Sequence, residues 1–168
     1  LKTEGVDTLV HLGIESPTHA TAWAHEVEVI GTMRVVEACQ AASIRKVVVA
    51  STTLLYGARP DNPNFLTEDH PLRASGRSPF LGDKMEVEHL VRKLSGGSKK
   101  TIVTVLRTAS LLGPTVRNYL TRYLSRRVAP MMLGYDPLWQ FVHEADAVAA
   151  FELAIERDVP GVFNVVAD

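Results

Sequence analysis

The chain has 168 residues, with 46% hydrophobic and 22% charged side chains and a formal net charge of −1. This balance is typical of one globular domain with a hydrophobic core. It gives no long-range attraction to nucleic acid or to an anionic membrane. No apolar run approaches the roughly 20 residues of a membrane span, and we expect no signal peptide. Cys39 is the only cysteine and the histidines lack metal-binding spacing, so we expect no disulfide, no metal site and a cytoplasmic protein.

Short β-branched runs alternate with helical patterns along the chain. Strands are expected over 6–12, 45–50, 101–106 and 162–166, with shorter ones over 131–133 and 138–142. Helices are expected from 16–18 to about 42, from Pro79 to Gly96, over 116–127 and over 144–157. This alternation predicts an α/β fold in which a parallel sheet has right-handed crossovers, all within one domain over 1–168.

The strand at 45–50 leads into the first candidate site. Ser51, Thr52 and Thr53 follow it directly, and ligands in open α/β sheets bind at the carboxyl ends of strands. The alternative is that these hydroxyls only cap the strand and open a turn. The irregular stretch 58–79 contains four prolines. It is a second candidate, because loops of this length inside a compact domain are usually functional.

Seven segments occur in the order and spacing of one known family. They are VDTLVHLG (6–13), VIGTMRVVEAC (29–39), VVVASTTLLYG (47–57), FLGDKMEVE (80–88), LRTASLLGP (106–114), FVHEADAVAA (141–150) and GVFNVVAD (161–168). On these segments the chain resembles the NAD-dependent epimerase/dehydratase branch of the extended short-chain dehydrogenase/reductase family. The resemblance implies a parallel-sheet, Rossmann-like fold that binds NAD or NADP, with a small carboxyl-terminal substrate region.

In that family a glycine-rich phosphate loop precedes the segment that matches Val6, and the chain has no GxGxxG pattern. The resemblance therefore implies a partial Rossmann-like fold without its first strands and its phosphate loop. We expect these 168 residues alone to bind NAD or NADP weakly or not at all. The strand 6–12 would present an open edge, and family members pair two of their helices between subunits, so we expect a homodimer.

The resemblance also implies catalytic roles. Family members use a hydroxyl, a tyrosine and a lysine, and the matching positions are Thr52, Phe80 and Lys84. The lysine binds the nicotinamide ribose and lowers the tyrosine pKa by its charge, while the tyrosine moves a proton. Phenylalanine carries no proton, so we expect low activity that Phe80→Tyr should raise, and we expect the Phe80 ring near Thr52 and Lys84. The alternative for Lys84 is a solvated helix residue.

Further positions are assigned by the same resemblance. Cofactor contacts fall on Leu12, Gly13, Ser51 and Lys84, and substrate contacts fall on Thr108 and Ser110. Glu28 and Ser110 stand where family members often have asparagine. Asp146 also matches a family acid, but stabilisation of a helix start explains it better. His143 is expected to be a packed or capping residue.

Three interpretations of function stay open. The first is an NAD(P)-dependent epimerase, dehydratase or reductase that acts on a nucleotide-sugar. The second is a catalytically inactive NAD(P)- or ligand-binding module of the same fold, which Phe80 favours. The third is a purely structural or interaction role. Nucleic acid and membranes are not expected as partners.

Overall fold

A four-stranded sheet forms the centre of the computed structural model. Its strands are β1 (Thr8–His11), β2 (Lys46–Thr52), β3 (Ile102–Thr108) and β6 (Gly161–Val165), in the order β1-β2-β3-β6. The structure describes residues 4–13, 22–74, 78–96, 101–130, 133–134 and 138–167. Neighbouring strands are parallel throughout this sheet, so their carboxyl ends lie at one edge. The predicted parallel α/β fold is confirmed.

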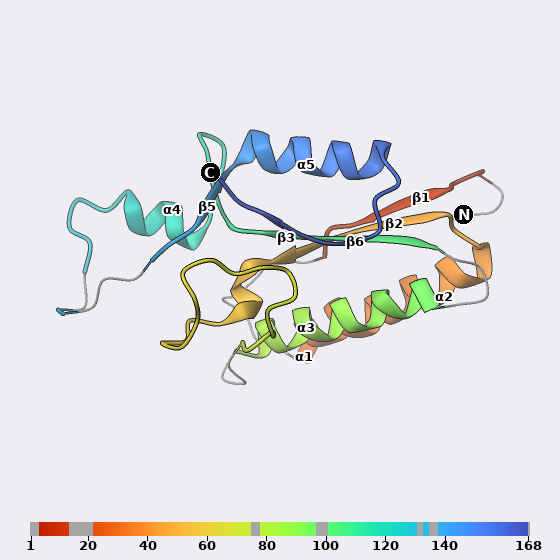
Figure 1. The fold of residues 1–168 in the computed structure, drawn as a ribbon, viewed down its shortest axis with the longest axis horizontal. Coiled ribbons are helices and arrows are strands. Elements are labelled where there is room, and N and C mark those ends of the chain that lie inside the picture. The colour runs from red at the N-terminus through yellow and green to blue at the C-terminus, as the bar shows by residue number, and fades with distance from the viewer. Residues whose placement is uncertain are drawn as a thin grey trace.

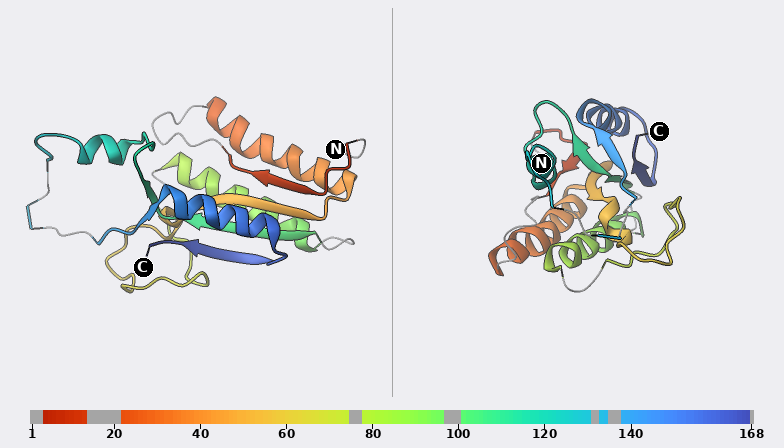
Figure 2. Two further views of the ribbon diagram at one scale, coloured as in Figure 1. Left: turned by 90° about the horizontal axis from the view of Figure 1, so that it is seen from above. Right: turned by 90° about the vertical axis from the view of Figure 1, so that its left-hand side faces the viewer.

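Helices cover both faces of the sheet (Figure 1, Figure 2). α2 (Gly31–Ala42) and α3 (Pro79–Arg92) lie side by side on one face, and α5 (Glu144–Glu156) lies on the other. Successive side chains of a strand point to opposite faces. Val47 and Val49 therefore pack with the residues of α2 and α3, while Val48 packs with Ala154 of α5. Because both faces are covered, this part of β2 is entirely apolar.

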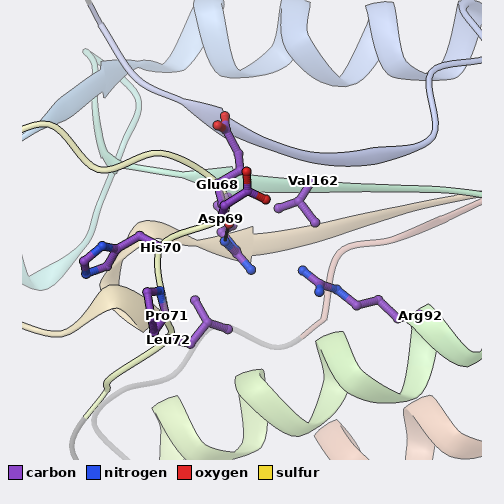
Figure 3. A pocket seen from close by; sticks show the side chains of 8 residues that line it. Glu68, Asp69, His70, Pro71, Leu72, Arg92 and Val162 are labelled. Atoms are coloured by element: carbon purple, nitrogen blue, oxygen red, sulfur yellow. Dashed lines mark hydrogen bonds between the residues drawn. The ribbon is translucent and has the colours of Figure 1, made fainter.

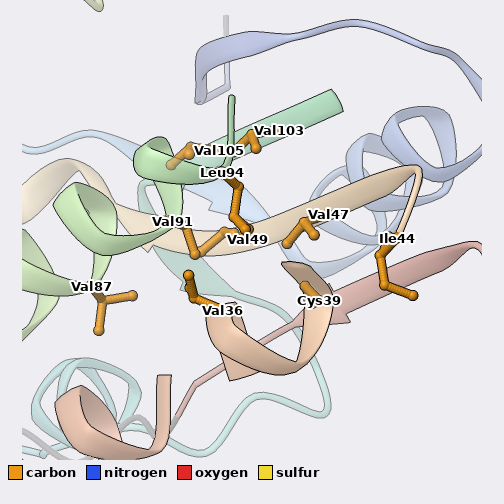
Figure 4. Close-up of a cluster of buried hydrophobic side chains, with 10 residues drawn as sticks. All are labelled: Val36, Cys39, Ile44, Val47, Val49, Val87, Val91, Leu94, Val103 and Val105. Carbon is orange, nitrogen blue, oxygen red and sulfur yellow. The ribbon is translucent and has the colours of Figure 1, made fainter. Parts of the chain in front are cut away.

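The larger core lies between the sheet and the helix pair α2 and α3 (Figure 4). Its buried members are Val36, Cys39, Ile44, Val47, Val49, Val87, Val91, Leu94, Val103 and Val105. The apolar faces predicted for the two helices are therefore mostly used inside this chain. Met33 is an exception, with 38% of its surface exposed.

The helix before β2 contains a wider turn. α1 (Ala22–His25) continues through a π-helical turn over Glu26–Ile30 into α2, and the predicted start at 16–18 lies outside the described residues. α3 begins as predicted, because Ser78 accepts a hydrogen bond from the N–H of Leu81 at 3.4 Å and proline suits the first turn. Across the described residues, none of the helices is long and apolar enough for a membrane crossing.

Beyond the carboxyl ends of the strands, a two-stranded parallel sheet pairs β4 (Ser110–Leu112) with β5 (Phe141–His143). β4 was not predicted. The strand predicted over 131–133 is wrong at Leu133, which lies in a turn, and 131–132 lie outside the described residues. α4 (Tyr119–Leu124) is shorter than the predicted helix 116–127, because a capping box at Asn118 fixes its start. α4 and the loop 58–74 extend at this end of the sheet (Figure 1).

Candidate functional site

Hydroxyl residues of the predicted site lie where β2 and β3 end. Thr52 and Thr108 are opposite each other in the register of the two strands. Thr108 Oγ1 donates to the carbonyl of Ser51 at 3.1 Å. Thr52 Oγ1 accepts the backbone N–H of Leu54 at 3.3 Å and caps the short 3₁₀ turn Thr53–Tyr56. The sheet thus brings Ser51, Thr52 and Thr108 together. The hydrogen bond that Thr52 makes here is explained by its role as the cap of the 3₁₀ turn.

A buried ion pair lies beside Gly13, two residues after the end of β1. Lys84 of α3 and Glu28 of the π-helical turn are only 4% and 6% exposed, and Nζ lies 2.6 Å from Oε1. Lys84 is therefore not a solvated helix residue. Gly13 has a φ of 71°, and a methyl group on it would come within 2.6 Å of Lys84 Nζ and 2.8 Å of Glu28 Oε1. Both the backbone conformation and the lack of space favour glycine here.

Phe80 and His11 border this ion pair. The Phe80 ring lies one helical turn before Lys84, with its centroid 5.9 Å from Nζ, which is within cation–π range. His11 Nε2 lies 2.8 Å from Thr32 Oγ1, which donates to the carbonyl of Glu28 at 2.5 Å. Burial lowers the pKa of His11, Glu28 raises it and Lys84 lowers it, with a net decrease. Neutral His11 and the opposite charges of Glu28 and Lys84 therefore form a cluster without net charge at pH 7.

A second buried cluster, which the sequence did not predict, lies under β3. Arg107 Nε and Nη2 donate to the two carboxylate oxygens of Glu88 at 3.0 and 2.8 Å. Arg107 Nη1 donates to Tyr56 Oη at 2.9 Å, and this hydroxyl donates to Asn164 at 2.7 Å. Ser51 Oγ donates to Glu88 at 2.5 Å, so its hydroxyl belongs to this cluster. Burial lowers the pKa of Arg107, but Glu88 and Tyr56 raise it more.

A hollow of about 400 Å³ lies beside the second cluster (Figure 3). It is lined by Glu68, Asp69, His70, Pro71, Leu72, Arg92, Arg107 and Val162. Figure 3 shows Arg92 extending from α3 and Val162 from β6, with the loop residues at the other side. Each predicted site residue lies in the described part of the chain, and none of them lines this hollow. Among the described residues, no group of three or more His, Cys, Asp or Glu side chains could hold a metal ion.

Sequence comparison decides the family. A model of the NAD dependent epimerase/dehydratase family matches residues 1–166. The chain belongs to the NAD-dependent epimerase/dehydratase family. A relative in Mycobacterium tuberculosis, an uncharacterised protein, is 37% identical over 167 residues, which are 97% of this chain and 44% of that protein. The 3-diazoavenalumate denitrifying reductase of a Streptomyces species is 30% identical over 169 residues, covering 96% of this chain and 53% of that protein. This epimerase/dehydratase chain thus spans about half the length of these curated relatives.

Solved structures confirm the Rossmann-like fold of this epimerase/dehydratase chain. MoeE5 in complex with UDP-glucose and NAD matches with a TM-score of 0.76 at 27% identity, covering 96% of this chain and 56% of that one. UDP-glucose 4-epimerase of Thermus thermophilus, in complex with NAD, matches with a TM-score of 0.76, covering 96% of this chain and 57% of that one. Its 22% identity makes it evidence for the fold alone.

The remaining predicted positions of this epimerase/dehydratase chain have simple surroundings. Ser110 lies on β4 opposite Phe141 of β5, and Leu12 is 59% exposed directly after β1. His143 Nδ1 accepts the N–H of Ala145 at 3.2 Å, so the prediction of a capping role is confirmed.

The partners of the buried charges were missed by the sequence reasoning. Glu28 was noted because it departs from the family's asparagine, and this departure was the available signal for an unusual partner. Arg107 and Glu88 both fall in the matched segments 106–114 and 80–88, but nothing in those segments indicates that they meet.

Proposed function

We propose that this chain is part of an NAD(P)-dependent nucleotide-sugar epimerase/dehydratase-like protein in which Phe80 occupies the position of the catalytic tyrosine. One observation carries the proposal. A bare glycine backbone at Gly13 lies beside the buried ammonium group of Lys84, and the ring of Phe80 lies against that ammonium group. In this proposal a cofactor ribose comes close to a glycine backbone and accepts hydrogen bonds from charged N–H donors. This arrangement offers both, but its aromatic ring carries no proton.

The described residues fit the nicotinamide end of such a cofactor. Within the described part of the chain Lys84 donates to Glu28, and an ammonium group carries three N–H donors, which in this proposal also serve the ribose hydroxyls. We assign further cofactor contacts to Leu12, Gly13 and Ser51. The bound nicotinamide would accept or supply a hydride. In this proposal Lys84 of α3 holds the ribose beyond the end of β1.

We assign the substrate side to three hydroxyl residues. Thr52 would orient the reacting oxygen of the sugar, and Thr108 and Ser110 would contact the substrate. General acid–base catalysis is typically worth about 10²–10⁴-fold in rate. Because Phe80 removes the proton carrier of this mechanism, we expect slow turnover. The alternative is a catalytically inactive NAD(P)- or ligand-binding module, which the same phenylalanine favours.

Calorimetry of the full-length protein with NAD and with NADP tests the cofactor assignment. Lys84→Met combined with Glu28→Gln removes both charges and leaves no buried charge alone. A lost charged hydrogen bond is worth roughly 1.5–3 kcal/mol, so we expect about tenfold or greater weakening of cofactor binding. Lys93→Met changes an exposed lysine that follows the same helix and is the matched control. Equal affinities of the double variant and the control would contradict the assignment of Lys84.

A turnover assay separates an enzyme from a binding module. MoeE5 was solved with UDP-glucose and NAD, and the Streptomyces relative is named as a reductase. These two findings support UDP-sugars as first substrates and a parallel assay of NADH or NADPH oxidation. We expect slow conversion of at least one UDP-sugar by the full-length protein. Cofactor and UDP-sugar binding without any conversion would favour the inactive module.

We propose a homodimer that uses the outer side of the α1–α2 helix. Trp23 of α1 is 65% exposed and Met33 of α2 is 38% exposed, and we assign both side chains to the contact surface. Light scattering of the full-length protein should give a dimer, and Trp23→Glu with Met33→Glu should give a monomer. Glu37→Lys, an exposed change on α2, should leave the dimer intact.

A further inference from the structure

The charge of Lys84 is already balanced inside the protein. Nζ lies 2.6 Å from Glu28 Oε1, and both side chains are almost fully buried. A buried charge acts on its neighbours much more strongly than an exposed one, because water does not screen it. Any group beside Lys84 therefore experiences the ammonium ion together with its carboxylate, and the two contributions oppose each other.

Phe80 occupies the position where the charge of Lys84 would matter most. The centroid of its ring lies 5.9 Å from Nζ. If the oxygen of a tyrosine at position 80 lay about as far from Nζ as this centroid does, a lone positive charge there would lower the phenol pKa by roughly two pH units at an effective dielectric constant of about 20. A carboxylate in direct contact with the same ammonium ion cancels most of this effect.

We propose that Glu28 is a positioning residue that acts through Lys84: it supplies the negative charge that a tyrosinate at position 80 would otherwise supply. Positions 28 and 80 are coupled through one lysine, and the site accommodates an anion at one of them. This inference rests on the proposed function only because that proposal places Lys84 and position 80 in the active site. It also changes an expectation from the sequence, because Phe80→Tyr alone should now restore little activity.

Among the described residues, His11 and Asp83 are further titratable groups near the pair. His11 of β1 faces both Glu28 and Lys84, and its lowered pKa leaves it neutral above pH 8. Asp83 precedes Lys84 on α3 and is paired with His25 of α1 at 2.7 Å.

NMR titration of tyrosine labelled at ¹³Cζ tests the coupling in the full-length protein without cofactor. The resonance added by Phe80→Tyr should titrate near the ordinary tyrosine pKa of about 10. In Phe80→Tyr with Glu28→Asn, the same resonance should titrate at least one pH unit lower. Adding Lys84→Met to this double variant should return it toward the ordinary value. Phe80→Tyr with Glu26→Gln, which changes an exposed acid of the same turn, should behave like Phe80→Tyr alone.

Each outcome decides the proposal. A pKa already lowered by more than one unit in Phe80→Tyr alone, or no difference after Glu28→Asn, would overturn it. If the double variant does not fold, Phe80→Tyr with Glu28→Asp keeps the carboxylate and should match Phe80→Tyr, and a lowered pKa in either variant counts against the proposal. Failure of cofactor binding or turnover would contradict the proposed function, but would leave this titration unchanged.

Discussion

Two buried ion pairs lie near the carboxyl ends of the strands, and they differ in the number of acceptors that the described residues offer the cation. Arg107 donates to both carboxylate oxygens of Glu88, to Tyr56 and to the carbonyl of Glu68. Lys84 and Glu28 share one contact of 2.6 Å. Beside that contact is Gly13, where any side chain would collide with both charges.

A buried charge is tolerated when protein groups replace the water that it loses. Arg107 finds these groups within the chain, so it fastens β3 to α3, to the turn after β2 and to the loop 58–74. Lys84 has N–H groups without an acceptor among the described residues and faces a position that excludes side chains. We therefore propose different roles for these two pairs of similar burial. The pair whose cation has many acceptors supports the fold, and the pair whose cation has few acceptors among the described residues binds a ligand.

The largest expected effect comes from breaking the Arg107 network. Arg107→Met leaves Glu88 buried without its main partner, which should lower the free energy of unfolding by about 3–5 kcal/mol. Arg92→Met is the matched control, because Arg92 is half exposed and lies 3.5 Å from the same carboxylate. It should cost less than about 1 kcal/mol. Urea denaturation of the full-length protein measures both, and similar losses would mean that the network does not hold the fold.

Lys46 tests whether the number of hydrogen-bond partners or the residue type determines the role of a buried cation. It is a lysine like Lys84, but it is fully buried and donates to the carbonyls of Ala154, Ile155 and Arg157 at 3.3, 2.8 and 2.8 Å, where α5 ends. Hydrogen bonds to charged groups are worth roughly 1.5–3 kcal/mol, so Lys46→Met should destabilise the protein by about 2–3 kcal/mol.

Hydrogen exchange should locate this loss at the end of α5. Amides near Ala154 and Ile155 should exchange faster in Lys46→Met, because the last carbonyls of the helix lose their donor. Lys93→Met, at an exposed position, should change stability by less than about 0.5 kcal/mol. If Lys46→Met lowered the free energy of unfolding by no more than Lys93→Met does, solvent would replace the lysine at that position.

Gly13→Ala tests the other side of the comparison. Alanine at a φ of 71° is strained by about 1–2 kcal/mol, and its methyl group would displace Lys84 and Glu28 at a further cost of about 1 kcal/mol. Gly5→Ala shares the strain, since Gly5 has a φ of 64° with no atom within 4 Å of the added carbon. Thermal unfolding should therefore separate the two variants, and equal melting temperatures would mean that the ion pair moves aside freely.

Much of the fold was predictable because its signals are local. The β-branched run 47–49 indicates a strand covered on both faces, and Pro79 after a serine indicates a helix start. The pairing of β4 with β5 was not predictable, since Ser110–Leu112 is too short to show a period and its partner lies about thirty residues later. The π-helical turn has no recognisable sequence pattern.

The candidate site was predictable in its positions and not in its contacts. Gly13 and Lys84 were found through their motifs, and the structure places them together. Lys84 and Glu28 are 56 residues apart in the sequence, and charged residues are usually exposed. Nothing in the sequence therefore indicated that Lys84 and Glu28 would form a buried ion pair. The same reason explains why Arg107 and Lys46 were missed.

The smallest effect concerns the exposed pair that joins α1 to α3 beside the site. The pair consists of His25 and Asp83. The hydrogen bond and the charge interaction with Asp83 raise the pKa of His25, burial slightly opposes this, and Glu86 adds a weaker increase. A raised histidine pKa means that the stabilisation is fully present below the unfolded pKa of about 6.5 and is lost as the pH rises through the folded pKa.

Histidine proton NMR of the full-length protein, with His25→Gln for assignment, measures this pKa directly. Asp83→Asn should return the His25 pKa toward about 6.5, and Glu86→Gln should lower it by much less, because Glu86 acts only at a distance. Water weakens an exposed pair, so neither change should move the urea midpoint as far as Arg107→Met does. Equal shifts in the two variants would show that the general charge of α3, and not the 2.7 Å contact with Asp83, sets the pKa of His25.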